Sequence, residues 1–461
     1  MRKFPVELEV RGGVLFFGGV SAVELAERFG TPLLVYEEDK IRRAMREFRE
    51  TLSGLGVRYR LFYACKAYCS LAMAHVVREE GFGADVVSMG EMITALRGGI
   101  PPEDLLFHGN FKLDEELRFA VEQGIGTIVV DNAYELERLA SLAATQGGSR
   151  PIPILLRITP GVVAHTHRYI LTGQEDSKFG FDLESGQALA AVRLAMRTEG
   201  LRLRGIHMHV GSQLVSSEGP VQAVRRLEAL LTSVPEFVPE VLDLGGGFGV
   251  PYVVDDPHVP LRDLLVPVVE AVRELFSRLG HPEPELWWEP GRRVVASAGT
   301  TLYRVGGVKE IPGVRRYVAV DGGMNDNIRP ALYQAQYEAL LANRPLDPPE
   351  ALYTVAGRLC ESGDILIVDH PLPHPQPGDL LAVFVTGAYA YAMSSNYNRL
   401  PRPAVVFVRD GKARLVQRRE TIEDLLALDL PYGFGDCETA PSEVPNAAAR
   451  KALETRGAPE A

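Results

Sequence analysis

Several side chains that can do chemistry follow short apolar runs of the sequence. Lys66 ends the segment YRLFYACK, and His209 and Ser212 lie in HMHVGS. Glu289 and Arg292 lie in the segment EPGR. Each has an ordinary structural explanation alone, because a lysine after a strand is usually solvated and EPGR can be a simple turn. Together they supply an amine, an imidazole, a hydroxyl, a carboxylate and a guanidinium, which core packing does not require. The sequence therefore predicts one site assembled from several segments.

A glycine-rich segment, GGGFG at residues 245–249, adds an anion site to this set. It does not match G-x-G-x-x-G, so a dinucleotide fingerprint is not supported. Glycines lack a Cβ, which lets backbone N–H groups close on an anion such as a phosphate. Pyridoxal phosphate needs a lysine for its aldehyde, an acidic partner for its ring nitrogen and a cradle for its phosphate. Lys66, Glu289 and the glycines match these needs.

The elements that must position these residues follow a regular rhythm, in which eight apolar runs alternate with helix-like stretches. The runs are YRLFYA (59–64), ADVV (84–87), LLFH (105–108), TIVVD (127–131), IPILLRI (152–158), LRGIHMHV (203–210), EVLDL (240–244) and ELWWE (285–289). Continuous apolar strands covered by helices are typical of a parallel sheet that is buried on both faces. Eight such units favour a (β/α)8 TIM-type barrel, of about 250 residues, over an open doubly wound sheet. In such barrels the C-terminal ends of the strands carry the active site.

The sequence changes character after about residue 297, where strand-like runs follow one another with little helix between them. This pattern predicts a C-terminal all-β domain. We expect the N-terminal strands, including LLVY at 33–36, to join that domain. The predicted domains are residues 37–297 for the barrel and residues 1–36 with 298–440 for the β-domain. The Ala/Pro/Glu-rich residues 441–461 are expected to form a ragged tail.

Composition excludes several classes of protein. The 461 residues carry a formal net charge of −11, which argues against nucleic acid as a partner. No run approaches the roughly 18 apolar residues of a membrane helix, and the N-terminus lacks the apolar region of a secretory signal. The four cysteines, Cys65, Cys69, Cys360 and Cys437, form no CxxC pair and fit a reducing compartment. We therefore expect a cytoplasmic protein without a structural metal.

The motifs resemble a known family. Y-A-x-K, H-x-G-S, G-G-G-F and E-P-G-R, in this order, are similar to those of fold-type III pyridoxal-phosphate enzymes, which share an alanine racemase-like barrel. The segments at 158–181, 320–333, 360–364 and 387–403 resemble the diaminopimelate decarboxylases in particular. The resemblance extends from about residue 20 to residue 437. Tyr68 departs from it, because an asparagine is commoner there.

The resemblance implies roles for single residues. Lys66 would carry the cofactor as the internal aldimine, His209 would stack on its ring, Glu289 would pair with the ring nitrogen, and Cys360 would be the proton donor. The residues implied in cofactor binding are Lys66, His209, Ser212, Gly246, Gly247, Glu289, Pro290, Gly291, Arg292 and Tyr389. Those implied in substrate binding are Arg292, Arg329, Tyr333, Glu361 and Tyr389. Cys360 and Glu361 would come from the neighbouring subunit of a homodimer.

The activity that this resemblance implies is decarboxylation of meso-2,6-diaminopimelate to L-lysine, the last step of lysine biosynthesis. The alternatives within the scaffold are decarboxylation of ornithine, arginine or carboxynorspermidine, and racemisation of alanine. Outside it stand a metal-dependent hydrolase that uses His207 and His209, and a regulatory homologue without activity. Structural explanations also remain open: Cys360 as a small buried hydrophobe, Arg329 as a surface residue and His207 with His209 as barrel filling.

Overall fold

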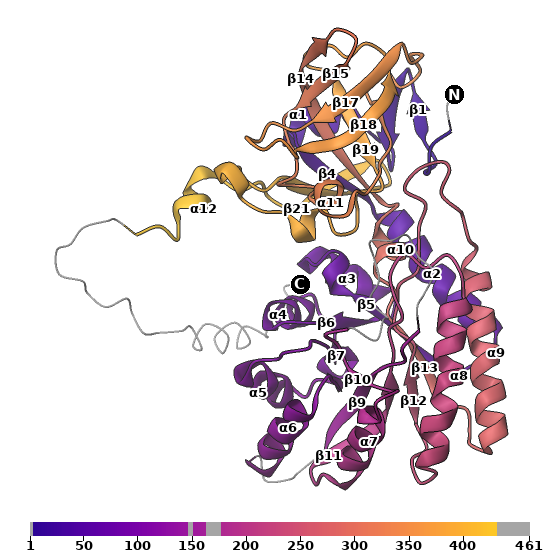
Figure 1. Ribbon diagram of the computed structural model, residues 1–461. Coiled ribbons are helices and arrows are strands. Elements are labelled where there is room, and N and C mark those ends of the chain that lie inside the picture. The colour runs from indigo at the N-terminus through magenta and orange to yellow at the C-terminus, as the bar shows by residue number, and fades with distance from the viewer. Residues whose placement is uncertain (1–2, 146–150, 163–176, 431–461) are drawn as a thin grey trace. The chain divides into compact units, whose positions relative to one another are not determined.

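The computed structural model describes residues 3–145, 151–162 and 177–430 (Figure 1). The predicted tail at 441–461, Cys437 and part of the motif at 158–181 lie outside the described residues. The chain up to Glu420 forms one compact unit. Residues from Thr421 onward form a second unit, whose described part contains helix α12 (Ile422–Leu426).

A closed barrel of eight parallel strands forms the first half of the fold (Figure 1). The strands are β5 (Tyr59–Ala64), β6 (Gly83–Val86), β7 (Leu105–Phe107), β8 (Thr127–Val130), β9 (Ile152–Thr159), β11 (Leu201–His207), β12 (Val241–Asp243) and β13 (Glu285–Trp288). Each overlaps one of the predicted runs. The ring is closed because β5 pairs with both β6 and β13, and β8 pairs with β9. The predicted (β/α)8 barrel is thus confirmed, with a short extra strand β10 (Phe181–Asp182) beside β9.

Helices connect and cover these strands. They are α2 (Glu38–Gly54), α3 (Leu71–Glu79), α4 (Met89–Arg97), α5 (Asp114–Gln123), α6 (Ala133–Thr145), α7 (Gln187–Arg197), α8 (Glu218–Ser233), α9 (Leu261–Leu279) and the short α10 (Arg292–Val295). Serine caps define where two of them begin. The Ser70 hydroxyl accepts the Met73 N–H at the start of α3, and the Ser88 hydroxyl accepts the Glu91 N–H at the start of α4.

The barrel interior is filled by its own hydrophobic cluster, to which six strands each contribute one side chain. The members are Phe62, Leu106, Val129, Leu155, Val241 and Trp287. Trp287 is fully buried, and the guanidinium groups of Arg60 and Arg204 lie 5.4 and 5.0 Å from its ring. The barrel is therefore a packed core, and a cavity can exist only toward one end of its strands.

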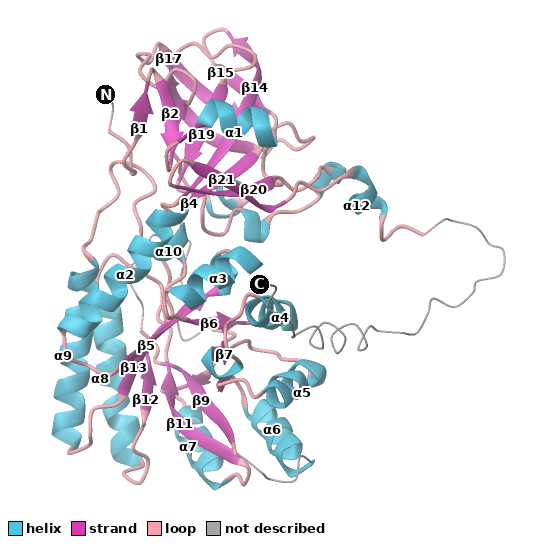
Figure 2. Cartoon of the chain, turned by 180° about the vertical axis from the view of Figure 1, so that it is seen from behind, coloured by secondary structure: helices cyan, strands magenta, loops and turns pink. Residues whose placement is uncertain are grey.

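The second half of the fold is a sheet domain with mostly antiparallel strands (Figure 2). Its main path is β18 (Ile365–Leu372), β17 (Ala351–Ala356), β15 (Arg315–Val320), β14 (Gly299–Ile311), β4 (Leu33–Glu37), β20 (Ala404–Arg409) and β21 (Lys412–Gln417). β19 (Leu380–Phe384) pairs with β14 and with β16 (Ala339–Leu341), and α11 (Arg329–Tyr333) follows β15.

The N-terminal strands divide between two sheets. β4 joins the large sheet as predicted, between β14 and β20. The strands β1 (Glu9–Arg11), β2 (Val14–Phe17) and β3 (Val20–Ser21) form a separate three-stranded sheet, followed by α1 (Ala22–Phe29). The Leu15 N–H donates to the Ala342 carbonyl at 2.8 Å, which ties this small sheet to the β-domain. The exact domain boundaries remain a prediction.

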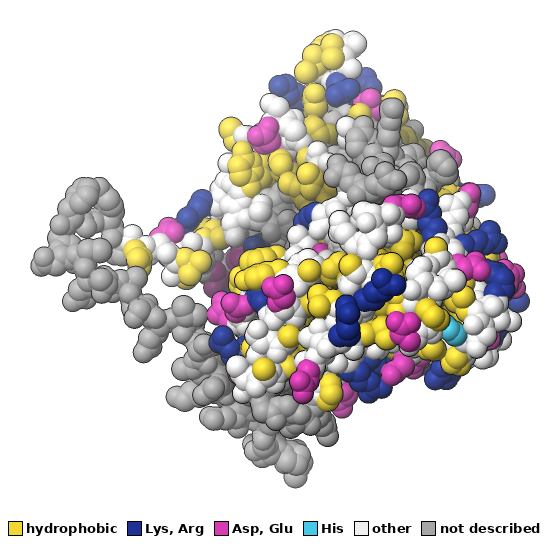
Figure 3. All heavy atoms as spheres, turned by 60° about the horizontal axis from the view of Figure 1, so that its bottom comes forward, with side chains coloured by type: hydrophobic (Ala, Val, Ile, Leu, Met, Phe, Trp, Pro, Cys, Tyr) yellow, Lys and Arg dark blue, Asp and Glu magenta, His cyan; other side chains and the backbone are white. Residues whose placement is uncertain are grey.

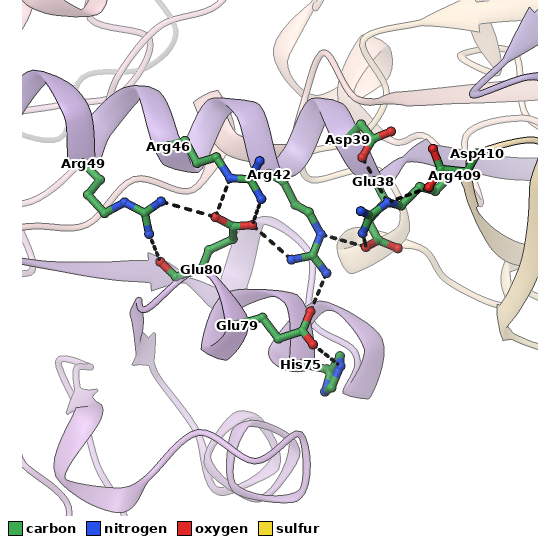
Figure 4. A network of polar contacts seen from close by, with 10 residues as sticks. All are labelled: Glu38, Asp39, Arg42, Arg46, Arg49, His75, Glu79, Glu80, Arg409 and Asp410. Carbon is green, nitrogen blue, oxygen red and sulfur yellow. Dashed lines mark hydrogen bonds and ion pairs between the residues drawn. The ribbon is translucent and has the colours of Figure 1, made fainter.

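A network of ion pairs joins α2 to α3 and to the end of β20 (Figure 4). Glu80 is almost fully buried, and it binds Arg42 at 3.0 Å and Arg46 at 2.7 Å. Glu38 binds both Arg42 and Arg409. The network thus connects a barrel helix with a strand of the β-domain.

Basic and acidic side chains are intermixed on the face of the described chain that Figure 3 shows. Within the described ranges, none of the helices has the length and apolar character that crossing a membrane requires.

Candidate active site

A cavity of about 470 Å³ lies at the C-terminal ends of the barrel strands. Its walls contain most of the residues that the sequence predicted for cofactor binding. These are Lys66, His209, Ser212, Gly246, Gly247, Glu289, Gly291, Arg292 and Tyr389. Pro290 is not in the wall, but its carbonyl accepts the Ala64 N–H at 3.2 Å and so joins the ends of β13 and β5. The closed barrel and the β-domain residue Tyr389 therefore bring together segments that are more than 300 residues apart in the chain.

Lys66 lies in the short 3₁₀ turn Cys65–Ala67 after β5, and its side chain is exposed to the cavity. The Tyr389 N–H donates to the Ala67 carbonyl at 2.9 Å, so a β-domain residue holds this turn. Burial lowers the pKa of Lys66, but the charge of Asp85 and the nearby Tyr389 outweigh burial and leave the pKa raised. The free lysine is therefore protonated at neutral pH.

Tyr68, where the chain departs from the commoner asparagine, is a packing residue. It is fully buried, its ring stacks on Tyr36 at 4.6 Å, and its hydroxyl donates to Gln417 at 2.8 Å. The departure therefore affects the contact between barrel and β-domain, and Tyr68 is not one of the residues that line the cavity.

Glu289 directly follows β13 and is 6% exposed. His108 Nε2 lies 2.6 Å from one carboxylate oxygen, and His207 Nε2 lies 3.4 Å from the other. Burial alone would raise the pKa of Glu289, but His108 first and His207 second lower it, and the net pKa is well below the usual value. Burial lowers the pKa of His207 itself to about 4, so His207 is neutral at pH 7. Glu289 is therefore a buried, ionised carboxylate in the cavity wall.

His209 presents a neutral imidazole to the same cavity. Burial, reinforced by the charge of Lys66, holds its pKa well below the usual value. Its Nδ1 accepts the Gly246 N–H at 3.3 Å, which fixes the orientation of the ring. A flat, uncharged ring held in this way is suited to stacking on a planar cofactor.

Neighbouring backbone atoms leave no room for a side chain at Gly246 and Gly247. A Cβ on Gly246 would lie 2.1 Å from the Glu289 carbonyl oxygen, and one on Gly247 would lie 2.2 Å from the Gly211 carbonyl oxygen. Gly247 also has a φ of +92°, in the region that glycine favours. Any residue with a Cβ at these two positions would therefore require the neighbouring backbone to move.

Arg292 gives this region its charge. Its Nη2 donates to the Ser212 hydroxyl at 2.9 Å, while its buried Nε has no hydrogen-bond partner among the described residues. An unpartnered guanidinium N–H beside a glycine cradle is the donor set that a phosphate needs. The cavity therefore fits pyridoxal phosphate in three respects: an amine at Lys66, a carboxylate at Glu289 and an anion site at Arg292.

Several residues in the cavity wall were not predicted as site residues. They are Asp85, His108, Asn110, Phe111, Arg157 and Phe179, whereas His207, also in the wall, was considered only as a metal ligand. The guanidinium of Arg157 lies 4.3 Å from the Phe179 ring, and burial raises the pKa of Asp85. The positions of Asp85 and His108 at strand ends were signals that could have identified them.

The residues that could bind a metal ion in the structure differ from those that the sequence suggested. His207 forms a group with His108 and Glu289, whose possible ligand atoms lie within 4.8 Å of one another, whereas the sequence considered His207 with His209. His209 is not a member of this group, and its Nδ1 accepts the Gly246 N–H.

Besides Pro290, four predicted residues lie outside the wall of this cavity. Arg329 is 4% exposed, so its reading as a surface residue was wrong. Tyr333 is 37% exposed at the end of α11. Cys360 and Glu361 are exposed in the loop between β17 and β18, where the Cys360 N–H donates to Asn398 at 2.8 Å. Cys360 therefore lies in a loop, and the alternative of a buried cysteine was wrong.

Comparison with known proteins identifies the scaffold. Residues 38–296 match the family model described as pyridoxal-dependent decarboxylase, pyridoxal binding domain. The chain is 53% identical to the diaminopimelate decarboxylase of Bacillus subtilis (strain 168), over 92% of this chain and 97% of that protein. It is 44% identical to the diaminopimelate decarboxylase of Mycobacterium tuberculosis (strain ATCC 25618 / H37Rv), over 91% of this chain and 95% of that protein.

Solved structures of diaminopimelate decarboxylases have the same fold as this chain. A crystal structure of the diaminopimelate decarboxylase from M. jannaschii in complex with L-lysine has a TM-score of 0.86 and 35% sequence identity, covering 92% of this chain and 98% of that one. The Helicobacter pylori enzyme complexed with L-lysine has a TM-score of 0.80 and 32% identity, covering 88% and 98%. By its sequence, its fold and the residues of its cavity, the chain belongs to the diaminopimelate decarboxylase family of pyridoxal-dependent decarboxylases.

Proposed function

We propose that this protein uses pyridoxal phosphate to decarboxylate meso-2,6-diaminopimelate to L-lysine, the last step of lysine biosynthesis. The observation that carries the proposal is the single cavity that holds the Lys66 amine, the ionised Glu289 carboxylate and the unpartnered Arg292 Nε. The relatives with 42–53% identity bear the name of this activity.

The cofactor would be held by residues that the cavity wall already contains. Lys66 would carry it covalently, His209 would stack on its ring, and Ser212, Gly246, Gly247, Gly291, Arg292 and Tyr389 would surround its phosphate side. Pro290 would act by joining the strand ends beneath. When bound, pyridoxal phosphate supplies an electron sink for the pair that remains after a carboxylate leaves.

The chain's own residues would control protons around that chemistry. Glu289 is ionised and buried, so it can hold a proton on a nitrogen that faces it. Lys66 has a raised pKa and must lose a proton before its nitrogen becomes a nucleophile. The carboxylate of Asp85, which lines the same cavity, is the leading charge that raises the pKa of Lys66.

Substrate recognition would involve two carboxylates and a second ammonium group. Arg292, Arg329, Tyr333 and Tyr389 would bind the carboxylate side, and Glu361 would bind the distal ammonium. A site that hydrogen-bonds a charged group rejects analogues without it by roughly 10⁴ or more. Binding of the second carboxylate would favour diaminopimelate over ornithine and arginine, which lack that group.

Cys360 and Glu361 would act in the cavity of a second copy of the chain. Both are exposed and lie outside the wall of their own cavity, which supports a homodimer with shared sites. Cys360 would donate the proton that replaces the lost carboxylate. The cysteines at 65, 69 and 360 are free thiols, which is consistent with the cytoplasm as the place of reaction.

The test is to incubate purified protein with meso-diaminopimelate, with and without added pyridoxal phosphate, and to measure L-lysine. We expect lysine only with the cofactor, and activity that survives chelators. Ornithine, arginine, carboxynorspermidine and alanine are assayed in parallel. Turnover of one of these in place of diaminopimelate would overturn the proposed substrate, and lysine formation that is lost with chelators would favour the metal site.

A further inference from the structure

Tyr252 lies between two buried arginines of the site and contacts both. Its hydroxyl accepts a hydrogen bond from Arg292 Nη1 at 2.5 Å. The Arg329 guanidinium lies 4.5 Å from the centre of its ring, within the range of a cation–π contact. Tyr252 is therefore a direct bridge from Arg292, in the cavity wall, to Arg329 in the β-domain, outside it.

The two arginines have no carboxylate partner among the described residues. Arg292 donates to the hydroxyls of Ser212 and Tyr252, and Arg329 donates to the Tyr337 hydroxyl at 2.5 Å. They are only 7% and 4% exposed. A buried guanidinium without a carboxylate is costly unless an anion binds it, so these two cations indicate a place for anionic groups of a ligand.

The surroundings of Tyr252 fix its position. Its own N–H donates to the Asp256 carboxylate at 2.7 Å, and the Val253 N–H donates to the same oxygen at 3.2 Å. Its ring meets the Tyr337 ring edge to face, with centroids 5.6 Å apart. Burial raises the pKa of Tyr252, but the charges of Arg292 and Arg329 lower it more, so the net pKa is lowered. The hydroxyl oxygen is thus polarised toward negative charge between two cations.

We propose that Tyr252 is a positioning residue that holds Arg292 and Arg329 together as one receptor for the carboxylate at the non-reacting end of the substrate. The inference rests on the proposed function, and it assigns specificity to a residue on the loop that follows the glycine cluster. The hydroxyl sets the direction of Arg292, and the ring face supports Arg329. Tyr252 itself need not touch the substrate.

The experiment compares two ligands that differ only in that carboxylate. D-Lysine is meso-diaminopimelate without the carboxylate at its L-centre. We measure KM and kcat for diaminopimelate and the inhibition constant of D-lysine, for wild type and Tyr252→Phe. We expect the variant to raise KM about 10- to 100-fold, the loss of one charge-assisted hydrogen bond, with a smaller change in kcat. The inhibition constant of D-lysine for the variant is expected to stay within about twofold of its wild-type value. D-Lysine lacks the carboxylate that Arg292 and Arg329 would bind.

Two further variants keep the result interpretable. Tyr303→Phe removes another buried hydroxyl, one without a hydrogen-bond partner among the described residues, and is expected to leave both constants unchanged. In an Arg329→Ala background, Tyr252→Phe is expected to have a smaller effect than in wild type, because the two residues act together. Cofactor affinity, followed by tryptophan fluorescence of the apoprotein, and the melting temperature show whether Tyr252→Phe remains folded and loaded.

The outcomes separate the two proposals. Wild-type protein that makes no lysine from diaminopimelate overturns the proposed function itself. An active wild type whose Tyr252→Phe variant keeps its KM, or weakens diaminopimelate and D-lysine equally, overturns the role of Tyr252 alone.

Discussion

The Nε2 atom of His108 lies 2.6 Å from a carboxylate oxygen of Glu289, and both side chains are buried in the wall of the cavity. Both His108 and His207 lower the pKa of Glu289, and His108 has the larger effect. This contact couples the end of β7 to the end of β13. It gives the proposed site a carboxylate whose pKa is far below the working pH.

Replacing His108 with Ala is expected to move the acid limb of the pH–activity profile. The pKa of Glu289 is lowered in the folded protein, so its ionised form is lost only as pH falls through that low value. Without His108 burial dominates and the pKa rises, so activity is lost at a pH about one to three units higher. The measurement is kcat/KM against pH for both proteins. His75→Ala, which changes a half-exposed histidine in the network of Figure 4, is the control. An acid limb that stays in place would refute the role of His108.

Gly247→Ala is expected to weaken cofactor binding by at least about tenfold, since a Cβ there would lie 2.2 Å from the Gly211 carbonyl oxygen. The backbone at Gly247 or Gly211 must shift to make room, and this displaces the N–H groups of the glycine segment that would bind the phosphate. The dissociation constant of pyridoxal phosphate, measured by fluorescence titration of the apoprotein, tests this. Gly54→Ala is the matched control, because a Cβ at Gly54 meets nothing within 4 Å at the end of helix α2. Equal affinities for the two variants would show that Gly247 has no part in the cradle.

Mixing inactive variants tests whether the sites are shared between chains. Lys66→Ala and Cys360→Ala chains are each expected to be inactive, and random exchange between them should restore about a quarter of wild-type activity, one intact site in half of the dimers. Lys66→Ala mixed with Glu289→Gln is the control, because both residues belong to one barrel. No recovery in the first mixture, in dimers shown to exchange by mass, would contradict a shared site.

The buried Glu80 is expected to stabilise the fold without taking part in the reaction. Glu80→Ala leaves Arg42 and Arg46 without this partner and should lower the free energy of unfolding by about 3 kcal/mol at pH 7. Burial raises the pKa of Glu80 but Arg46 and Arg42 lower it more, so the folded pKa lies below the ordinary 4.5. The stabilisation is therefore complete above about pH 4.5 and is lost as pH falls through the folded pKa. Urea unfolding of both proteins at pH 7 and in acid measures this. A difference that does not shrink in acid would show that the ion pairs are not its cause.

The sequence predicted the elements well, because the barrel strands are continuous apolar runs separated by amphipathic helices. It also placed Lys66, His209 and Glu289 at strand ends, where barrel closure brings them into one cavity. It did not predict that His108 would bind Glu289, since that contact joins strands that are far apart in the chain and depends on the register of a closed sheet.

Contacts that the β-domain makes were harder to anticipate. An arginine side chain is usually exposed to solvent, yet Arg329 is buried against Tyr252 and Tyr337. The faces of these two aromatic rings take the place of water around its charge. No local pattern shows this. The separate sheet of β1–β3 was missed for a similar reason, since strand pairing over short segments leaves little signal in the sequence.

The most direct test of the central claim is the chemical identity of the lysine that carries the cofactor. Protein loaded with pyridoxal phosphate is reduced with borohydride, which fixes a pyridoxyl group on that lysine, and is then digested and analysed by peptide mass spectrometry. We predict one modified peptide, carrying the group on Lys66, and none in Lys66→Ala. A pyridoxyl group on another lysine, or no modified peptide in wild-type protein, would contradict the account.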